Sequence, residues 1–361
     1  HAIGSLSKGG AEFQCRQLAN HLDPARYDVA ILCFDGGPNP DLAEHVRPIF
    51  VDRGPKWNLL SLCRRIDSII EEEKPDVVQA WLPEVISVPA ALAARRRGIP
   101  VISGHRNTLS YDGELNKAVR DSLRLPQYLV ADRIISNFVI DEEPFLFRWL
   151  YSRRNGSCIF NGIAVDALRS LQIKELPVRA EYRLIFAGRL APQKGLPTAL
   201  RALKLLVDQG YHVHLTLFGE GPAAYEAELY ALVDELKIEA YVTFFGQCRD
   251  WQAYAGDATA LVFPTKGEGT SNVILESLAV GLPVVISDIA MARQLLRNGE
   301  NALIVASSHP AEWAGSLAAI LNDPALREKL SLGSATLAES FSVPGMVEQY
   351  DLLYHELLRN L

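Results

Sequence analysis

The feature that most constrains the fold is a regular alternation between short runs of β-branched residues and longer stretches with helical periodicity. Strand candidates occur at 28–34, 47–52, 76–81, 100–104, 133–137 and 157–161, and again at 182–188, 212–219, 241–246, 258–264, 283–287 and 302–306. Helical stretches fill the gaps, in the first half at 10–20, 59–73, 84–97, 115–130 and 139–151. This order predicts an α/β fold with doubly wound parallel sheets. The chain opens directly on a small apolar run, so we expect it to begin at the end of a strand.

A length of 361 residues suggests two such domains. The polar stretch 166–180 has no strand pattern and is predicted to be a linker. We therefore expect an N-terminal Rossmann-like domain over 1–165 and a second one over 181–340.

The last residues, 341–361, predict a C-terminal docking helix that packs back across the domains. Its apolar side chains recur at helical spacing and so share one face: Met346, Tyr350, Tyr354 and Leu357.

Charge and cysteine content exclude several classes of protein. There are 43 acidic and 36 basic residues, and the net charge of −7 argues against a nucleic-acid binder. Residues 1–165 are neutral overall, so the negative charge lies in the second half. The five cysteines are scattered singly, which argues against a disulfide framework and a structural zinc site and favours a cytoplasmic protein. No apolar run reaches the ~18 residues of a membrane span, and no secretory signal opens the chain.

Ligands of open parallel sheets bind where strands run into helices, so the strand-to-helix loops should carry the chemistry. The loop after 258–264 is the densest candidate, because Glu268 stands between two glycines that allow close backbone approach. The N–H groups of Ser271–Val273 then open a helix and suit a phosphate. Glu276 follows inside an apolar run, where a buried carboxylate needs donors such as ligand hydroxyls.

Two further loops suit an anionic ligand. After 182–188, Arg189 and Lys194 are two cations that could neutralise a diphosphate without a metal. Near the start, Gly9 and Gly10 precede a helix and would expose N–H groups. The run GEGPAA at 219–224 imitates a dinucleotide fingerprint, but it follows the second strand of its domain and contains a proline, so we reject it.

Several motifs together resemble the retaining glycosyltransferases of family 4, which have the two-domain GT-B fold with an interdomain cleft. These motifs are AGRLAPQKGLPTAL, LTLFGEGP, FFGQCRD, FPTKGEGTSNVILESLAVGLPVVIS and FSVPGMVEQYDLLY, together with the Gly-Gly-Ala-Glu opening. They stand in the family's order and spacing, and the resemblance covers essentially the whole chain. It is most specific in the Glu, seven residues, Glu pattern of Glu268 and Glu276.

The resemblance implies a role for each matched residue. Glu268 corresponds to the acid that binds hydroxyls of the transferred sugar, and Glu276 to the one that binds the ribose. Arg189 and Lys194 correspond to the cations on the donor diphosphate. Residues 245–249 would lie near the base, and 82–85 near the acceptor or sugar. The implied donor-binding set is Gly10, Arg189, Lys194, Gly219, Gly246, Glu268, Gly269, Thr270, Ser271, Asn272, Val273 and Glu276, and the implied catalytic set is Glu268, Arg189, Lys194 and His105.

Two questions stay open. His105 ends a strand and is expected to face the cleft, where the family often has a sugar-contacting histidine, yet a strand-end histidine can equally serve as a local hydrogen-bond partner. Arg106 and Asn107 are weaker candidates. Many family members have a phenylalanine where this chain has the smaller, polar Thr270 and Ser271, so the sugar cannot be carried over from them.

The function implied is transfer of a sugar from a nucleotide-sugar, with a UDP-sugar expected, to a hydroxyl of a glycan or lipid-linked glycan, with retention of configuration. No cofactor or metal is expected, because no Asp-x-Asp motif is present to hold a cation on the diphosphate. A nucleotide-sugar epimerase or hydrolase of the same fold and a non-catalytic nucleotide-sugar-binding protein remain alternatives. A basic stripe could also contact the inner face of an anionic membrane, although such stripes are often only solvated faces: Lys117, Arg120 and Arg124.

Overall fold

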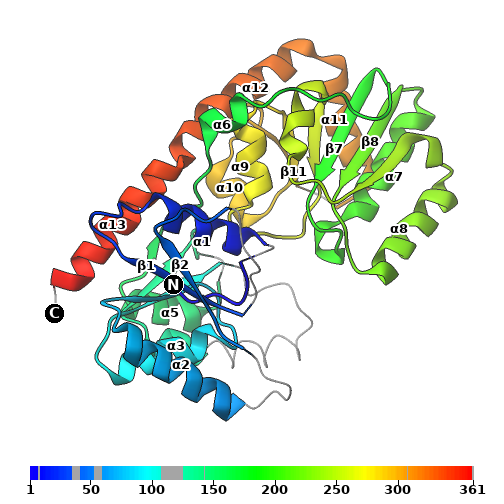
Figure 1. The fold of residues 1–361 in the computed structure, drawn as a ribbon. Coiled ribbons are helices and arrows are strands. Elements are labelled where there is room, and N and C mark those ends of the chain that lie inside the picture. The colour runs from blue at the N-terminus through cyan, green and yellow to red at the C-terminus, as the bar shows by residue number, and fades with distance from the viewer. Residues whose placement is uncertain are drawn as a thin grey trace. The chain divides into compact units, whose positions relative to one another are not determined.

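The computed structural model describes residues 1–6, 9–34, 41–52, 59–106, 125–141, 143–306 and 308–359. The chain forms two compact units. Unit 1 combines His1–Gly162 with Val343–Leu361, and unit 2 is Ile163–Ser342. Figure 1 labels many of their helices and strands. Unit 1 is therefore assembled from both ends of the chain.

The sheet of unit 1 is parallel throughout its described strands. Its opening residues lie between two of these strands, because Ala2 forms parallel bridges with both Leu32 and Ala80. This single bridged residue joins a pair of strands to a set of four. The strands, in spatial order on either side of Ala2, are β2 (Val46–Phe50) and β1 (Val29–Cys33), then β3 (Val78–Ala80), β4 (Val101–His105), β5 (Arg133–Ser136) and β6 (Ser157–Cys158).

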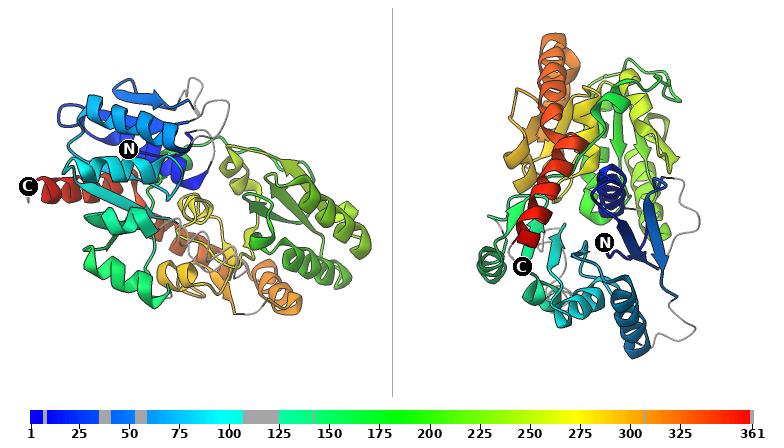
Figure 2. Two further views of the ribbon diagram at one scale, coloured as in Figure 1. Left: turned by 90° about the horizontal axis from the view of Figure 1, so that it is seen from below. Right: turned by 60° about the vertical axis from the view of Figure 1, so that its left-hand side comes forward.

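Helices cover both faces of this sheet, because alternate strand residues point to opposite sides. Leu32 and Val101 pack into one apolar core and Ile31 and Ile102 into the other. The first core lies beneath α2 (Leu59–Glu73), α3 (Ser87–Arg96) and α5 (Phe145–Arg153), and the second beneath α1 (Gly10–His21) and α13 (Val343–Arg359). Figure 2 shows α1 beside α13.

The predicted C-terminal helix is present as α13, and it belongs to unit 1. Its four predicted face residues are all buried in the second core. Polar contacts add to this packing, since Tyr27 donates a hydrogen bond to Asp351 over 2.6 Å and Tyr354 donates one to Gln79. The helix is thus an integral layer of a domain that begins more than 300 residues earlier.

Unit 2 contains a six-stranded parallel sheet. In spatial order its strands are β12 (Leu303–Val305), β11 (Val284–Ser287), β10 (Ala260–Phe263), β7 (Tyr182–Ala187), β8 (Val213–Phe218) and β9 (Val242–Gly246). Its helices are α6 (Val165–Arg169), α7 (Leu196–Asp208), α8 (Ala223–Leu236), α9 (Asn272–Ala279), α10 (Ala290–Leu295), α11 (Pro310–Asn322) and α12 (Pro324–Ala338). The chain runs outward from β7 through β8 to β9, and then returns to the other side of β7 with β10. The order therefore reverses between β7 and β10, which is where open α/β sheets bind ligands.

The predicted linker at 166–180 is instead part of unit 2. It begins within α6, where Arg169 donates hydrogen bonds to the backbone oxygens of Ala279 and Ala335. Further along, Leu176 N donates to the Asp257 carboxylate over 2.8 Å. Arg169, one of the polar residues that suggested a linker, supplies two of these anchors, and the main chain of Leu176 supplies the third.

Candidate active site

The two loops that follow β7 and β10 meet at the point where the strand order reverses. These strands are hydrogen-bonded neighbours, with Leu184 opposite Ala260. Their carboxyl ends therefore lie side by side, and the Lys194 ammonium pairs with the Glu268 carboxylate across the two loops. Both side chains are 15% exposed, so the pair is sheltered but within reach of a ligand.

Neighbouring groups hold this pair in place. The Thr265 hydroxyl donates to Glu268 Oε1 over 3.0 Å, and the Lys194 ammonium lies 5.0 Å from the centre of the Phe263 ring. The Gln193 amide donates to Gly267 O over 2.7 Å, which ties the two loops together. Thr265 and Gln193 were missed by sequence reasoning, because only the strand order reveals that their loops touch.

Glycines allow the close approach of these loops. Gly195 has a φ of +67°, and a Cβ there would lie 2.0 Å from Pro264 O. The predicted donor residues Gly219 and Gly246 also have positive φ, and Gly219 N donates to Gly246 O over 2.8 Å. A Cβ on Gly219 would lie 1.9 Å from Gly188 O. These glycines let the ends of β7, β8 and β9 pack together at the edge where the site lies.

Helix α9 starts directly after the Glu268 loop. Gly269, Thr270 and Ser271 are buried, and Asn272 is the first helical residue. The Ser271 side chain makes no capping hydrogen bond to the first turn. The first turn, which includes Val273, directs N–H groups and the positive end of the helix dipole toward an anion.

Glu276 lies one turn further along α9 and is half-buried. Trp251 Nε1 and Gln252 Nε2 donate to its Oε2 atom over 3.0 and 2.6 Å. Burial raises the pKa of Glu276 to about 7, and these two hydrogen bonds offset only part of that effect. Both donors engage the same oxygen, so Oε1 remains for hydroxyls of a ligand. Trp251 and Gln252 were not predicted, although they directly follow the FFGQCRD motif.

Arg189 differs from its predicted partner Lys194. Its side chain is exposed, and within the described ranges it makes no ion pair or hydrogen bond. Of the two cations predicted to bind the diphosphate, Lys194 therefore contacts Glu268. Arg189, on the loop that follows β7, is exposed to solvent.

In unit 1, the predicted glycine Gly10 is the first residue of α1, and Gly9 before it has a φ of +124°. The Glu12 carboxylate folds back over Gly9, since a Cβ there would lie 2.1 Å from Glu12 Oε2. Glu84, in the predicted acceptor loop 82–85, accepts a hydrogen bond from Gly4 N over 2.7 Å. Burial is the main cause that raises the pKa of Glu12, and the Glu84 charge adds to it.

His105 does not face an open edge, and that expectation is wrong. Its ring is only 1% exposed and lies 4.1 Å from the centre of the Phe147 ring. The hydroxyl of Tyr128 lies 2.9 Å from Nδ1, and a carboxylate oxygen of buried Glu143 lies 3.7 Å from Nε2. The apolar cluster turns the side chain into unit 1, which agrees with the local hydrogen-bonding role.

Arg106 is also buried, and it links β4 to α13. It donates a hydrogen bond to the Tyr350 hydroxyl, and its guanidinium lies 4.4 Å from the centre of the Trp81 ring. The remaining candidates of this region lie outside the described residues: Asn107, Lys117, Arg120 and Arg124.

Comparison with known proteins decides the family. The model described as "Glycosyl transferases group 1" matches residues 181–323, and the one described as "Glycosyltransferase Family 4" matches residues 8–138. The chain is a family 4 (group 1) glycosyltransferase. The resemblance seen in the sequence is confirmed.

Individual relatives agree along the whole chain. An uncharacterized glycosyltransferase of Haemophilus influenzae is 23% identical over 95% of this chain and 96% of its own length. The lipopolysaccharide core biosynthesis glycosyltransferase LpsE of Rhizobium meliloti is 25% identical over 85% of this chain and 82% of its own. The crystal structure of Anabaena HepE in complex with UDP-glucose superposes with a TM-score of 0.79 at 19% identity, covering 100% of this chain and 98% of that one. The expected GT-B fold is thereby confirmed.

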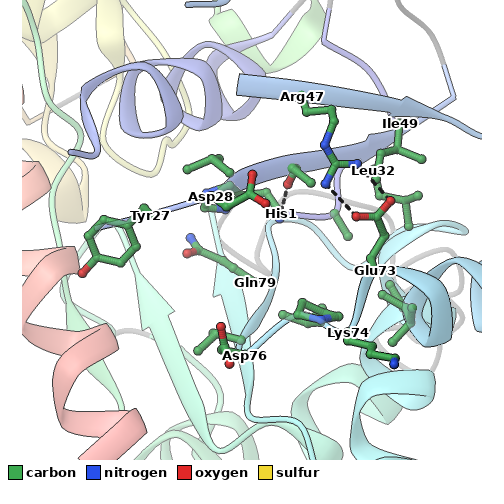
Figure 3. A pocket seen from close by; sticks show the side chains of 18 of the residues that line it. His1, Tyr27, Asp28, Leu32, Arg47, Ile49, Glu73, Lys74, Asp76 and Gln79 are labelled. Atoms are coloured by element: carbon green, nitrogen blue, oxygen red, sulfur yellow. Dashed lines mark hydrogen bonds and ion pairs between the residues drawn. The ribbon is translucent and has the colours of Figure 1, made fainter. Parts of the chain in front are cut away.

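The described cavities of the glycosyltransferase lie away from the predicted site. One, of about 330 Å³, lies in unit 1 at the amino-terminal ends of β1 and β3, opposite the edge that carries the loops. Figure 3 shows its wall, where Arg47 forms a two-pronged ion pair with Glu73 over 2.9 and 2.7 Å and the amino group of His1 donates to Ala30 O. A second, of about 320 Å³, is lined by Arg95, Asp132 and their neighbours at the same edge.

The described residues contain neither a metal-binding cluster nor a membrane-spanning helix. No group of three or more His, Cys, Asp or Glu side chains is arranged there to hold a metal ion. No described helix is both long and apolar enough to cross a bilayer.

Proposed function

We propose that this glycosyltransferase transfers a sugar from a UDP-sugar to a hydroxyl of a glycan or lipid-linked glycan, with retention of configuration and without a metal ion. The observation that carries the proposal is the Lys194–Glu268 pair beside the start of α9, with Glu276 one turn beyond. A cation, a helix N-terminus and two carboxylates on two touching loops and one helix match the diphosphate, sugar and ribose of such a donor.

The chemistry follows from these groups. The bond between the sugar C1 and the diphosphate oxygen breaks, and negative charge develops on the departing UDP. Lys194, Arg189 and the N–H groups of the first turn of α9 stabilise that charge. Glu268 accepts hydrogen bonds from sugar hydroxyls, and Oε1 of Glu276 accepts them from the ribose. The acceptor oxygen bonds to C1 on the face that the diphosphate leaves, and the acceptor proton passes to the departing phosphate.

The relatives support the choice of substrates. HepE binds UDP-glucose in its crystal structure, and LpsE is named for lipopolysaccharide core biosynthesis. We accordingly infer a UDP-sugar donor, an acceptor of the polysaccharide or lipopolysaccharide type and a site of action at the cytoplasmic face of a membrane, where the stripe of Lys117, Arg120 and Arg124 would add contact.

The test is transfer from a panel of UDP-, GDP- and ADP-sugars, with the anomeric configuration of the product read by NMR. Lys194→Ala and Glu268→Ala should each lower kcat about 100-fold or more, as loss of a charge-stabilising group does at other active sites. Lys204→Ala, which removes a half-buried lysine that pairs with Asp208 on the same helix α7, is the control and should keep full activity.

Each alternative has its own outcome. An epimerase or hydrolase would change or release the sugar without an acceptor, and a binding protein would take up the donor without turnover. Inversion at C1, or near-normal transfer by Lys194→Ala, would contradict the proposal.

A further inference from the structure

Helix α5 presents large apolar side chains to solvent. Phe145, Leu146 and Trp149 are 74%, 64% and 46% exposed. The opposite side of the same helix is buried in unit 1 through Phe147 and Leu150. A helix that packs on a core normally has a polar outer face. The outer face of α5 therefore needs an explanation.

The charges within α5 have one sign, although Asp141 shortly before the helix is also exposed. Between Pro144 and Arg154 there are three arginines and no acidic residue. Arg148 and Arg153 are exposed, and the Arg153 guanidinium lies 5.1 Å from the centre of the Trp149 ring. The acidic residue nearest the helix start, Glu143, is turned inward against His105.

A neighbouring helical turn continues the apolar surface. Residues 125–130 are helical and lie beside α5, because the Tyr128 ring is 5.2 Å from that of Phe147 and Arg154 donates a hydrogen bond to Leu129 O. Leu125 and Leu129 stand one turn apart on this segment and are 38% and 47% exposed.

We propose that α5 is the surface by which unit 1 docks on an anionic phospholipid bilayer. Phe145, Leu146 and Trp149 enter the boundary between headgroups and acyl chains, and the arginines bind lipid phosphates. Tryptophan beside arginine on a short helix suits this interface, since the ring sits at headgroup depth and each cation near the surface adds about 1 kcal/mol.

The charge pattern favours lipid over a second copy of the chain. In a two-fold symmetric dimer through this face, α5 would oppose α5 and place arginines against arginines, with no acidic residue on the helix to neutralise them. A bilayer of phosphatidylglycerol supplies both the apolar layer and the neutralising phosphates. The proposal is independent of the proposed activity, because vesicle binding requires neither donor nor acceptor.

The experiment is sedimentation of the full chain with vesicles of phosphatidylcholine alone or with added phosphatidylglycerol. The native protein should bind the anionic vesicles, and the double variant Phe145→Ser/Trp149→Ser should bind at least about tenfold more weakly. The matched control is Leu332→Ser/Leu352→Ser, which removes side chains that are 70% and 64% exposed on α12 and α13 and should bind like the native protein.

Variants of the arginines and of Trp149 test the proposal in two further ways. Arg148→Glu/Arg153→Glu should weaken binding at least about tenfold and reduce its dependence on phosphatidylglycerol. Tryptophan fluorescence should shift to the blue on vesicle addition, and Trp149→Phe should abolish that shift even if the double serine variant proves unstable.

Three results would overturn the proposal: no binding to anionic vesicles, equal binding by the native protein and the Phe145→Ser/Trp149→Ser variant, or self-association in light scattering that this variant abolishes. Vesicle binding that survives the α5 variants but is lost on neutralising Lys117, Arg120 and Arg124 would reject α5 and support the stripe.

Discussion

The protonation of Glu276 gives a quantitative test of the donor half of the site. Burial raises the pKa of this carboxyl to about 7, and only its ionised form can accept hydrogen bonds from two ribose hydroxyls with full strength. With a pKa of about 7, roughly one-tenth of the protein is ionised at Glu276 at pH 6 and roughly nine-tenths at pH 8. The Kd for donor should therefore fall about tenfold between these pH values, which is ~1.4 kcal/mol.

The assay is calorimetric titration with UDP-glucose from pH 5.5 to about 8.5. The sugar nucleotide is preferred to UDP because the terminal phosphate monoester of UDP would itself titrate near pH 6, at about its second pKa. Glu276→Gln should bind weakly, with a Kd that does not change with pH. Glu228→Gln, an exposed substitution on α8, is the control and should keep the tenfold change.

The pH dependence of folding stability in the ligand-free protein gives a second test, because the raised pKa fixes the direction of the effect. A carboxyl whose pKa is higher in the folded than in the unfolded state favours folding at low pH, and this contribution is lost as pH rises from about 4.5 through about 7. The difference in Tm between Glu276→Gln and the native protein should accordingly grow in favour of the variant over that range. An unchanged pH dependence of Kd in Glu276→Gln would refute the reasoning.

Three further predictions concern the fold and the absence of a metal requirement. Gly195→Ala should lower the Tm of unit 2 and destabilise it by more than about 1 kcal/mol, because φ is positive and Pro264 O is in the way, whereas Gly210→Ala, with positive φ but open space, should have the smaller effect. Met346→Ala should destabilise unit 1 by about 2–5 kcal/mol in urea unfolding, while Leu352→Ala on the exposed side of α13 should stay within about 0.5 kcal/mol. The rate of sugar transfer should be unchanged in excess EDTA. If EDTA abolishes transfer and Mg²⁺ restores it, the cations of the loops are not sufficient to stabilise the departing diphosphate.

Periodicity was enough to predict individual helices of unit 1. The pattern over 59–73 coincides with α2, and the spacing of Met346, Tyr350 and Tyr354 identified the buried face of α13. Local patterns succeed here because burial of one face follows directly from which residues recur at helical spacing.

The contacts within the site were not accessible in the same way. Lys194 and Glu268 were each singled out, but as ligands of different donor groups, because their pairing depends on β7 and β10 being neighbours across more than 70 residues of chain. His105 was placed correctly at the end of β4, yet the direction of its ring is decided by Tyr128 and Phe147, which come from later segments. Sequence spacing gives position along a strand and says little about what packs against the side chain there.

The origin of α13 has a consequence for biosynthesis. Ile163–Ser342 is contiguous, so unit 2 can fold as soon as its last residue leaves the ribosome. Unit 1 is translated first but lacks one of its helical layers until Val343–Arg359 emerges, and until then the apolar residues around Trp81 and Ile135 have no cover from that helix. The usual order, in which the N-terminal domain completes its fold first, is thus reversed. A chain truncated after Ser342 should contain a protease-resistant unit 2 and a protease-sensitive unit 1.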